Sequence, residues 1–283
     1  MHNLTIAVIM TCFNRKEKTV KCVAGLINQT IMNGFDLYIC DDGSTDGTAD
    51  AIKSIFPAAI ILKGSGNLFW SRGMHVAMKA AVEKGYDLYL MINDDVEFFS
   101  TMWDSMYQAY LDNPKSGIVG CTVAKSTGKQ SYGGSNFIVN HKGDYIGPML
   151  APKDDEYVKC DLANWNCFLI DKAIVEEIGL IDNRYEHAMG DFDYSFRMRK
   201  VGYNLVLAKE YVGYCENNSI GNTFKDKQLG RRKRIEKLFA ANGLPVKSWY
   251  YFTKTFYEHG HIKNFLVPYI KYLDCILFGK DCK

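Results

Sequence analysis

The sequence predicts an α/β fold in which helices cover both faces of a mostly parallel sheet. Short runs of β-branched residues alternate with longer helical stretches in the first half of the chain, and each run ends in polar residues. Because ligands of such sheets bind outside the carboxyl ends of the strands, we expect these polar ends to meet in one crevice. The expected strands are residues 4–10, 36–40, 59–62 and 88–92, and the expected helices are residues 16–29, 46–54 and 71–84.

The composition excludes several classes of protein. A chain of 283 residues that is 47% hydrophobic can bury a full core. Its 34 Lys and Arg against 32 Asp and Glu give a net charge of +2, so we predict no nucleic-acid partner. The nine cysteines lack the CxxC spacing of zinc sites, and the sequence shows neither a signal peptide nor an apolar run of about 18 residues. We therefore expect reduced thiols and a cytoplasmic location.

The strongest single motif is a pair of adjacent carboxylates directly after the apolar run LYLMI. Asp94 and Asp95 follow Asn93 there, and neighbouring carboxylates in one crevice repel each other unless a cation or hydrogen bonds compensate. Mg²⁺ and Mn²⁺ take oxygen ligands and bridge diphosphates, which makes this a candidate metal site. The alternative is a solvated turn in which Asp95 caps the next helix.

A second polar strand end reads DDGSTDGT, residues 41–48. Gly43 permits a tight turn, and a polar side chain after it can cap the following helix. An upstream carboxylate, Asp41 or Asp42, would then face the crevice and could accept hydrogen bonds from a nucleobase or a ribose hydroxyl. The alternative is a well-capped turn without a ligand. The chain contains neither GxGxxG nor a P-loop pattern that ends in GK[ST].

Five segments together resemble the family 2 glycosyltransferases, which have the GT-A fold. They occur in the order and approximate spacing of that family over about residues 4–225, and they look particularly like the branch found in bacterial polysaccharide gene clusters. The resemblance implies a GT-A catalytic domain over residues 1–224, with a nucleotide-binding half at 1–116 and an acceptor-binding half at 117–224. The five segments are TCFNR, DDGSTDGT, GNLFWSRGM, NDDVEF and GDFDYSFRMRKVGY.

The resemblance also implies roles for residues at the first two strand ends and at the carboxylate pair. Thr11 and Phe13 match the first strand end, where the backbone and a ring contact the base. Asp42, with Asp41 beside it, matches the carboxylate that reads the nucleobase. Asp95 matches the usual metal ligand, and Asp94 matches a residue near the ribose or the metal.

Further residues match segments near the donor sugar and the acceptor. Gly66, Asn67 and Arg72 fall in the segment that approaches the donor, and the alternative for Arg72 is an ordinary solvated helix charge. Trp165, in NWNCFLI, resembles an aromatic wall for the donor sugar and the acceptor, because an aromatic face packs well on a sugar ring. Core packing is the alternative for this tryptophan.

Asp191 matches the general base of the inverting members of the family. Such a carboxylate takes the proton from the acceptor hydroxyl, while the metal stabilises the departing diphosphate. The alternative is that Asp191 is a plain N-cap of the next helix. Asp193 is expected to pair with Arg197 or Arg199.

The sequence departs from the family pattern in two places. Many relatives carry Glu-Asp at the base motif, where this chain has Gly190 before the carboxylate. Many also supply a metal-binding His where this chain reads GYCEN, residues 213–217. The third protein ligand of the metal therefore stays open among Glu216, His187 and water alone.

A basic run and an aromatic stretch end the chain. Residues 225–237 hold seven basic and two acidic side chains, and apolar residues further on recur near helical spacing. We therefore expect residues 225–283 to form a basic linker and an aromatic amphipathic helical tail. This tail would attach to an anionic membrane surface, pack on the catalytic domain, or join a second subunit in a homodimer.

The predicted function is that of an inverting, metal-dependent glycosyltransferase of the hexosyltransferase type. The resemblance implies a UDP- or dTDP-sugar donor, Mn²⁺ or Mg²⁺ as cofactor, and a glycan acceptor, polyprenyl-linked in some relatives, in bacterial cell-surface polysaccharide synthesis. Two alternatives stay open. The first is a catalytically silent carbohydrate- or nucleotide-sugar-binding protein on the same fold. The second, a sugar nucleotidyltransferase, should carry a Gly- and Arg-rich loop after the first strand, and TCFNRKEK has no glycine.

Overall fold

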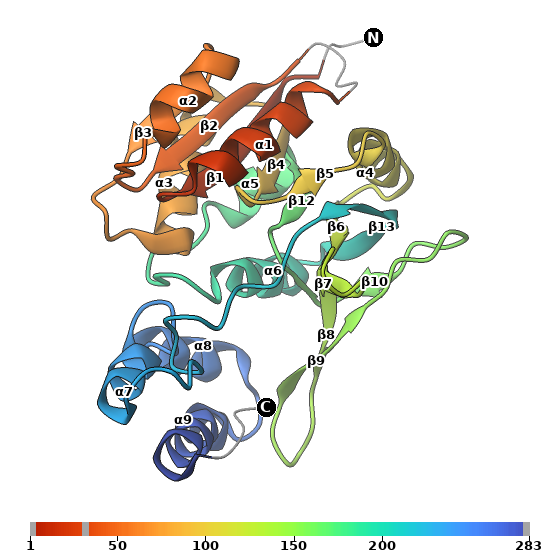
Figure 1. The fold of residues 1–283 in the computed structure, drawn as a ribbon. Helices are drawn as coiled ribbons and strands as arrows, with labels where there is room; N and C mark the ends of the chain where they lie inside the picture. Colours follow the sequence, from red (N-terminus) through yellow and green to blue (C-terminus); the bar gives the residue numbers. More distant parts are fainter. Residues whose placement is uncertain (1–3, 30–33, 280–283) are drawn as a thin grey trace.

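The central sheet carries the predicted parallel strands at one end (Figure 1). A computed structural model describes residues 4–29 and 34–279. The strand order is β10-β13-β6-β12-β4-β1-β2-β3, in which β4, β1, β2 and β3 pair in parallel. All four agree with the predicted ranges to within about two residues, which confirms the α/β fold class. Their bounds are β1 (Ile6–Cys12), β2 (Asp36–Asp41), β3 (Ile60–Lys63) and β4 (Leu88–Ile92).

The second half of the chain extends this sheet with strands of both directions. β12 (Cys167–Asp171) lies antiparallel between β4 and β6 (Ser116–Val123), and β13 (Asn204–Tyr214) runs parallel to β6. Short strands add to β13 and β6, and three more form a separate small sheet. The short strands are β5 (Glu97–Phe98), β7 (Gln130–Tyr132) and β10 (Lys159–Cys160), and the small sheet has β8 (Gly134–Ile138), β9 (Tyr145–Leu150) and β11 (Leu162–Ala163).

Helices cover both faces of the sheet, because successive strand side chains point to opposite sides. Ala7 packs into a core cluster with residues of α3 (Phe69–Lys84), and Val8 packs into the opposite cluster with α1 (Lys16–Ile27) and α4 (Met102–Asp112). The predicted arrangement of helices on two faces is therefore confirmed. The remaining helices of this part of the chain are α2 (Thr48–Ile55), α5 (Lys172–Ile178) and α6 (Gly190–Lys200).

Three helices follow the sheet where the sequence predicted a basic linker and a helical tail. Figure 1 shows α6 between the sheet and these helices. They are α7 (Arg231–Phe239), α8 (Val246–Phe256) and α9 (His261–Phe278).

An aromatic tail cluster joins these three helices to α6. Phe192 and Phe196 of α6 pack against the cluster, and the Phe196 ring stacks on Phe256 with centroids 4.5 Å apart. Packing on the preceding domain, one of the predicted alternatives, is therefore the arrangement of α8. The buried members of the cluster are Tyr185, Phe224, Leu238, Trp249, Phe252, Tyr257, Tyr269 and Ile276.

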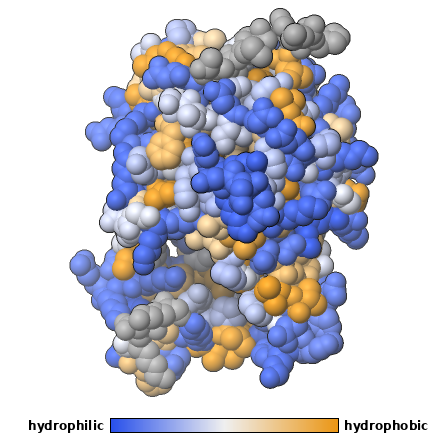
Figure 2. Space-filling model, turned by 90° about the vertical axis from the view of Figure 1, so that its right-hand side faces the viewer, coloured by the Kyte–Doolittle hydropathy of each residue, from blue (hydrophilic) through white to orange (hydrophobic). Residues whose placement is uncertain are grey.

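The surface and the cysteines agree with the composition. Figure 2 shows a face on which hydrophilic side chains predominate and hydrophobic ones form separate patches. Among the helices of the described residues, none has both the length and the hydropathy needed to cross a membrane. The eight cysteines of the described residues are buried, and Cys282 lies outside the described residues.

Candidate active site

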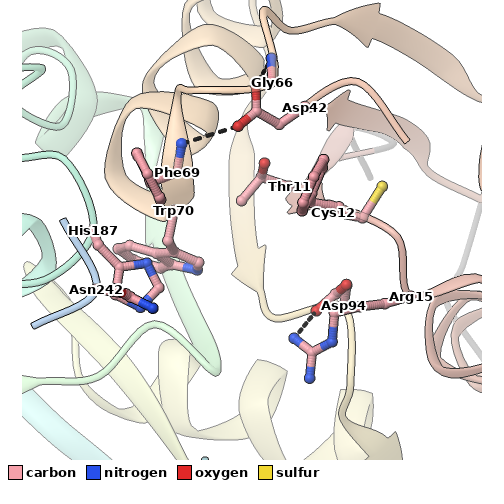
Figure 3. Close-up of a pocket in the computed structure, with 11 residues that line it drawn as sticks. Thr11, Cys12, Arg15, Asp42, Gly66, Phe69, Trp70, Asp94, His187 and Asn242 are labelled. Carbon is pink, nitrogen blue, oxygen red and sulfur yellow. Dashed lines mark hydrogen bonds and ion pairs between the residues drawn. The ribbon is translucent and has the colours of Figure 1, made fainter. Parts of the chain in front are cut away.

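A cavity of about 350 Å³ lies at the carboxyl ends of β1, β2 and β4 (Figure 3). Five of the predicted site residues line it, namely Thr11, Phe13, Asp42, Gly66 and Asp94. The expectation that the polar strand ends meet in one crevice is therefore confirmed. Its other lining residues are Cys12, Arg15, Phe69, Trp70, His187 and Asn242.

Asp42 holds the loop that forms one wall of this cavity. Its side chain is buried, and Oδ1 accepts a hydrogen bond from the backbone N–H of Gly66 at 2.8 Å. Oδ2 accepts from the backbone N–H groups of Leu68 and Phe69 at 2.9 and 3.0 Å. Phe69 has φ 59, a strained left-handed conformation for a phenylalanine, so this carboxylate also fixes the irregular start of α3. The predicted contact of Asp42 with a nucleobase stays a prediction.

The neighbouring predicted residues have different surroundings. Thr11 Oγ1 donates to the Cys40 carbonyl at 2.9 Å, and the Phe13 ring is 48% exposed at the cavity. An exposed ring in this place is available to stack on a base. Asp41 instead accepts from the backbone N–H of Ser44 at 2.7 Å and is absent from the cavity lining, which agrees with the turn-cap alternative for this residue.

Asn67 and Arg72 do not line the cavity. Asn67 is exposed, whereas Arg72 Nε donates to the Asn183 carbonyl at 3.1 Å and its guanidinium lies 3.5 Å from Glu186. Arg72 therefore ties α3 to the segment before α6. The predicted contacts of Asn67 and Arg72 with the donor stay predictions. The places of these two residues outside the cavity lining do not favour such contacts.

A second cavity of about 200 Å³ shares a wall with the first, because Arg15, Trp70, Asp94 and His187 line both. Four asparagines are among its other lining residues, and their amide groups can both donate to and accept from hydroxyl groups. The remaining lining residues are Asn93, Tyr132, Asn164, Trp165, Asn166, Ala188, Met189, Asp191, Phe192 and Asn218.

Asp191 lies in the second cavity at the start of α6. Burial raises the pKa of its carboxyl group to about 6, although the backbone N–H of Phe192 donates to Oδ1 at 2.9 Å. Asn164 Nδ2 lies 3.4 Å from Oδ2. Met189, not Asp191, occupies the N-cap position of the helix, so the plain N-cap alternative is wrong.

The other carboxylate of this motif has a structural partner. Asp193 is buried and pairs with Arg197 at 2.7 Å. This is one of the two pairings that the sequence predicted. Arg199 pairs instead with Asp161 at 2.8 Å. Asp193 is thus committed to an ion pair, and only Asp191 of the two lines the cavity.

Trp165 is a core residue that also lines the second cavity, and its predicted contact with a sugar stays a prediction. Its side chain is 1% exposed and its ring packs against those of Trp70, Phe168 and Tyr194. It also lines the second cavity, and its buried Nε1–H has no hydrogen-bond partner among the described residues. An unpaired buried donor of this kind is costly.

The carboxylate pair after β4 is already occupied by protein donors. Arg15 donates to Asp94 Oδ1 at 2.8 Å and to Asp95 Oδ2 (Figure 3 draws the first bond). Thr19 Oγ1 lies 3.3 Å from Asp94 Oδ2, and Lys18 Nζ lies 3.8 Å from Asp95 Oδ2. The helix-cap alternative for Asp95 is wrong, because the next helix, α4, has Thr101 at its N-cap.

Of the three open candidates for the third metal ligand, Glu216 is directed elsewhere, and His187 and water stay predictions. Cys215 Sγ, from the segment where relatives carry a histidine, lies 3.5 Å from Asp95 Oδ1. Glu216 turns away and accepts from the Ser126 backbone N–H at 2.9 Å. Within residues 4–29 and 34–279, no group of three or more His, Cys, Asp and Glu side chains is arranged to hold a metal ion. In this arrangement the residues do not fit a divalent cation, and ligation by Asp95 stays a prediction.

Sequence reasoning missed several residues that line both cavities or close one of them. Arg15 stands inside the TCFNR motif, and Trp70 inside GNLFWSRGM, so both were within segments already singled out. Trp70 Nε1 donates to Asn93 Oδ1 at 2.8 Å, a contact between distant segments. Asn242, from the turn between α7 and α8, lies on the same side of the first cavity as His187 in Figure 3, and no local pattern marks it.

Residues 7–179, well over half of the chain, match the family described as Glycosyl transferase family 2. The chain belongs to this family. The matched segment ends before α6, so the cavity wall that carries Asp191 lies outside it. No curated protein matches this family 2 chain by sequence.

Two solved structures share the fold of this family 2 glycosyltransferase. A mannosyltransferase from Pyrobaculum calidifontis, solved with GDP-Man and Mn²⁺, superposes with a TM-score of 0.59 at 11% identity and covers 98% of this chain and 74% of that one. GalNAc-T7, solved with UDP, GalNAc and Mn²⁺, superposes with a TM-score of 0.57 at 13% identity and covers 89% of this chain and 51% of that one. The chain thus spans about half the length of the second. Identities this low show the fold alone, and they confirm the predicted GT-A fold.

Proposed function

We propose that this chain transfers a sugar from a nucleotide diphosphate sugar to a hydroxyl group of a glycan acceptor, with inversion at the anomeric carbon. The shared wall of the two cavities is the observation that carries this proposal. A donor with its nucleoside in the first cavity and its sugar in the second has its diphosphate at that wall, beside Arg15 and His187. The amide-rich lining of the second cavity suits the hydroxyl groups of a sugar.

Asp191 is the general base of this proposal. Its pKa of about 6 keeps it ionised at neutral pH, yet makes it more basic than an ordinary aspartate. It takes the proton of the acceptor hydroxyl while that oxygen bonds to the anomeric carbon and the bond from this carbon to the diphosphate oxygen breaks. The amide of Asn164 beside Oδ2 orients the carboxylate.

The donor nucleotide and the acceptor are the finer parts of the proposal. The resemblance of the sequence motifs supports a UDP- or dTDP-sugar and an acceptor of bacterial cell-surface polysaccharide synthesis. The solved structures of the same fold hold GDP-Man and UDP, so guanosine donors belong among the candidates. A divalent cation at Asp95 stays a prediction, and Arg15 is the cation that lies beside this carboxylate.

A panel of UDP-, dTDP- and GDP-sugars should contain at least one compound that raises the melting temperature of the protein. A ligand at 100 times its dissociation constant stabilises the native state by about 2.7 kcal/mol, which corresponds to a shift of about 4–5 °C for a chain of this size. Differential scanning fluorimetry with EDTA and with Mn²⁺ measures it. If no nucleotide sugar stabilises the protein, the proposal is wrong.

Two further assays separate the alternatives. A transferase is expected to hydrolyse the stabilising nucleotide sugar slowly when no acceptor is present. The release of the nucleoside diphosphate measures this hydrolysis. Binding without any hydrolysis or transfer would favour a catalytically silent protein. Turnover that depends on added pyrophosphate would favour a sugar nucleotidyltransferase.

We also propose that α9 contacts an anionic membrane surface. Six apolar side chains of this helix are 42% to 71% exposed, and it also carries the exposed Lys263 and Lys271. An amphipathic helix with lysines beside an apolar face suits anionic lipids. The six are Ile262, Leu266, Val267, Ile270, Leu277 and Phe278.

The double substitution Leu266→Glu with Ile270→Glu should weaken binding to vesicles of anionic lipid by about tenfold or more. Two apolar side chains that would be buried in the lipid are then replaced by carboxylates. Turnover of a water-soluble acceptor should be retained, since neither residue lines a cavity. Co-sedimentation with vesicles measures the first effect, and Leu111→Glu, at a 53% exposed leucine of α4, is the matched control. If the wild-type protein does not bind vesicles but forms dimers through α9, the alternative that the tail joins a second subunit is favoured.

A further inference from the structure

We propose that Arg15 is the cation that binds the diphosphate of the donor, so that this transferase works without a divalent metal ion. The inference rests on the proposed function, because it assigns a residue to the diphosphate of a nucleotide-sugar donor. It differs from the prediction made from the sequence, in which a metal ion at Asp95 has this task.

The contacts of Arg15 account for the carboxylate pair without a metal. One guanidinium nitrogen lies 2.8 Å from Asp94 and the other bonds to Asp95, so a single cation bridges both carboxylates. Each of the two remaining carboxylate oxygens has its own neighbour, Thr19 Oγ1 at 3.3 Å and Cys215 Sγ at 3.5 Å. Protein groups therefore lie beside all four oxygens that would ligate a metal, and Arg15 donates to one oxygen of each carboxylate.

The local charge also balances. Arg15 and Lys18 carry two positive charges, which match the two negative charges of Asp94 and Asp95. A divalent ion between the carboxylates would have to displace the guanidinium from both, and the displaced cation would still lie a few ångströms away. Two cations at such a distance repel each other strongly in a partly buried site. The ion pairs thus compete directly with metal binding.

Arg15 also lies where a diphosphate is expected. It is one of the residues that line both cavities, and its side chain is 34% exposed while those of Asp94 and Asp95 are almost buried. A guanidinium has five N–H donors, of which the two carboxylate bonds use two. The carboxylates hold the planar group in one orientation, and its other donors are left for phosphate oxygens, which arginine binds in a bidentate manner.

The position of Arg15 in the chain makes this orientation rigid. It is the N-cap residue of α1, three residues after the end of β1, and β1 is the neighbour of β4 in the sheet. The Arg15 carbonyl also accepts from the Thr19 hydroxyl at 3.0 Å, and that same hydroxyl lies beside Asp94. The cation and its two carboxylates are therefore carried by adjacent strand ends of the core sheet.

The test compares binding of UDP, dTDP and GDP to the full chain in EDTA and in Mn²⁺ by isothermal titration calorimetry. We expect wild-type protein to bind one of them in EDTA, with an affinity that Mn²⁺ changes by less than about threefold. Arg15→Gln should bind it about tenfold or more weakly in EDTA, because a charge-assisted contact is lost. Mn²⁺ should then restore binding to this variant, since the freed carboxylates of Asp94 and Asp95 become available as ligands.

Direct Mn²⁺ binding, followed by electron paramagnetic resonance, gives a readout that does not depend on the nucleotide. Arg15→Gln should bind Mn²⁺ at least about tenfold more tightly than wild-type protein. Lys21→Gln is the matched control, because it removes an equal charge from the same helix at a residue that pairs with Glu97. It should behave as wild-type protein in both measurements.

Arg15→Lys keeps the experiment decisive if the glutamine variant does not fold. It retains the charge that Asp94 and Asp95 need but not the planar fork, so we expect weaker binding in EDTA and no rescue by Mn²⁺. Wild-type protein that binds a nucleotide only with Mn²⁺ overturns the inference and leaves the proposed function standing. Wild-type protein that binds none of the three nucleotides in either condition overturns the proposed function and this inference together.

Discussion

The Asp191→Asn variant is expected to lose turnover by about 10²–10⁴-fold while it keeps its fold and its affinity for the donor. An amide cannot accept the proton of the acceptor hydroxyl, whereas its size and its oxygen preserve the contact with the Phe192 backbone N–H. The lost interaction exists only in the transition state, so kcat should fall much more than the donor KM changes. Initial rates with saturating donor measure the effect, and thermal unfolding tests the fold.

The pH dependence of the wild-type rate provides an independent check of this base. A carboxylate with a pKa of about 6 becomes protonated as the pH falls through that value, about two units higher than for an ordinary aspartate. The rate should therefore decline below about pH 6, and this limb should be absent from the residual rate of Asp191→Asn. Asp161→Asn, at a carboxylate outside both cavities, is the control that should leave turnover nearly unchanged. Near-normal turnover of Asp191→Asn would remove Asp191 from the mechanism.

The Asp42→Ala variant is expected to lose about 3 kcal/mol of unfolding free energy together with its affinity for nucleotides. Its carboxylate accepts three backbone hydrogen bonds, from Gly66, Leu68 and Phe69, and alanine leaves these N–H groups without their acceptor. The loop that forms one cavity wall then loses the hydrogen bonds that fix its backbone. Urea unfolding measures the stability, and nucleotide titration measures the affinity.

The two effects of this substitution separate two roles of Asp42. If the carboxylate only read a nucleobase, affinity would fall and stability would not. Asp42→Asn should lie between alanine and wild type, because one amide oxygen replaces two carboxylate oxygens as acceptors. Asp46→Ala is the matched control, since Asp46 also accepts backbone hydrogen bonds but is exposed, and its loss of stability should be much smaller. Unchanged stability of Asp42→Ala would contradict the loop-holding role.

The parallel part of the sheet, β1 to β4, was predictable, because its signals are local. Apolar runs of five to seven residues between turn-forming residues predict β1, β2 and β4, and their order in the chain predicts parallel pairing. The predicted start of α3, residue 71, was less accurate than its end, because α3 begins at Phe69. This start depends on hydrogen bonds to Asp42, which is distant in the sequence. The tail was predicted as one amphipathic unit, but Pro245 begins α8 and Gly260 begins α9 as separate helices.

The candidate site was predictable to the extent that strand ends meet. The strand ends thus predicted Thr11, Asp42 and Asp94, the family resemblance implied Asp191, and all four line the cavities. Ion pairs between elements were not predictable in the same way. The TCFNR motif does not predict that the guanidinium of Arg15 bridges two carboxylates about 80 residues away. This contact depends on how β1 and β4 lie in the sheet.

The aromatic tail cluster restricts how this chain can be recombined with others. α6 presents Asp191 to the second cavity and Phe192 and Phe196 to the C-terminal helices, so one helix belongs to the reaction site and to the tail interface. A chimera that joins residues 1–224 to another tail would leave these rings facing foreign side chains. A workable exchange therefore keeps the side chains Phe192 and Phe196 together with the C-terminal helices that pack on them.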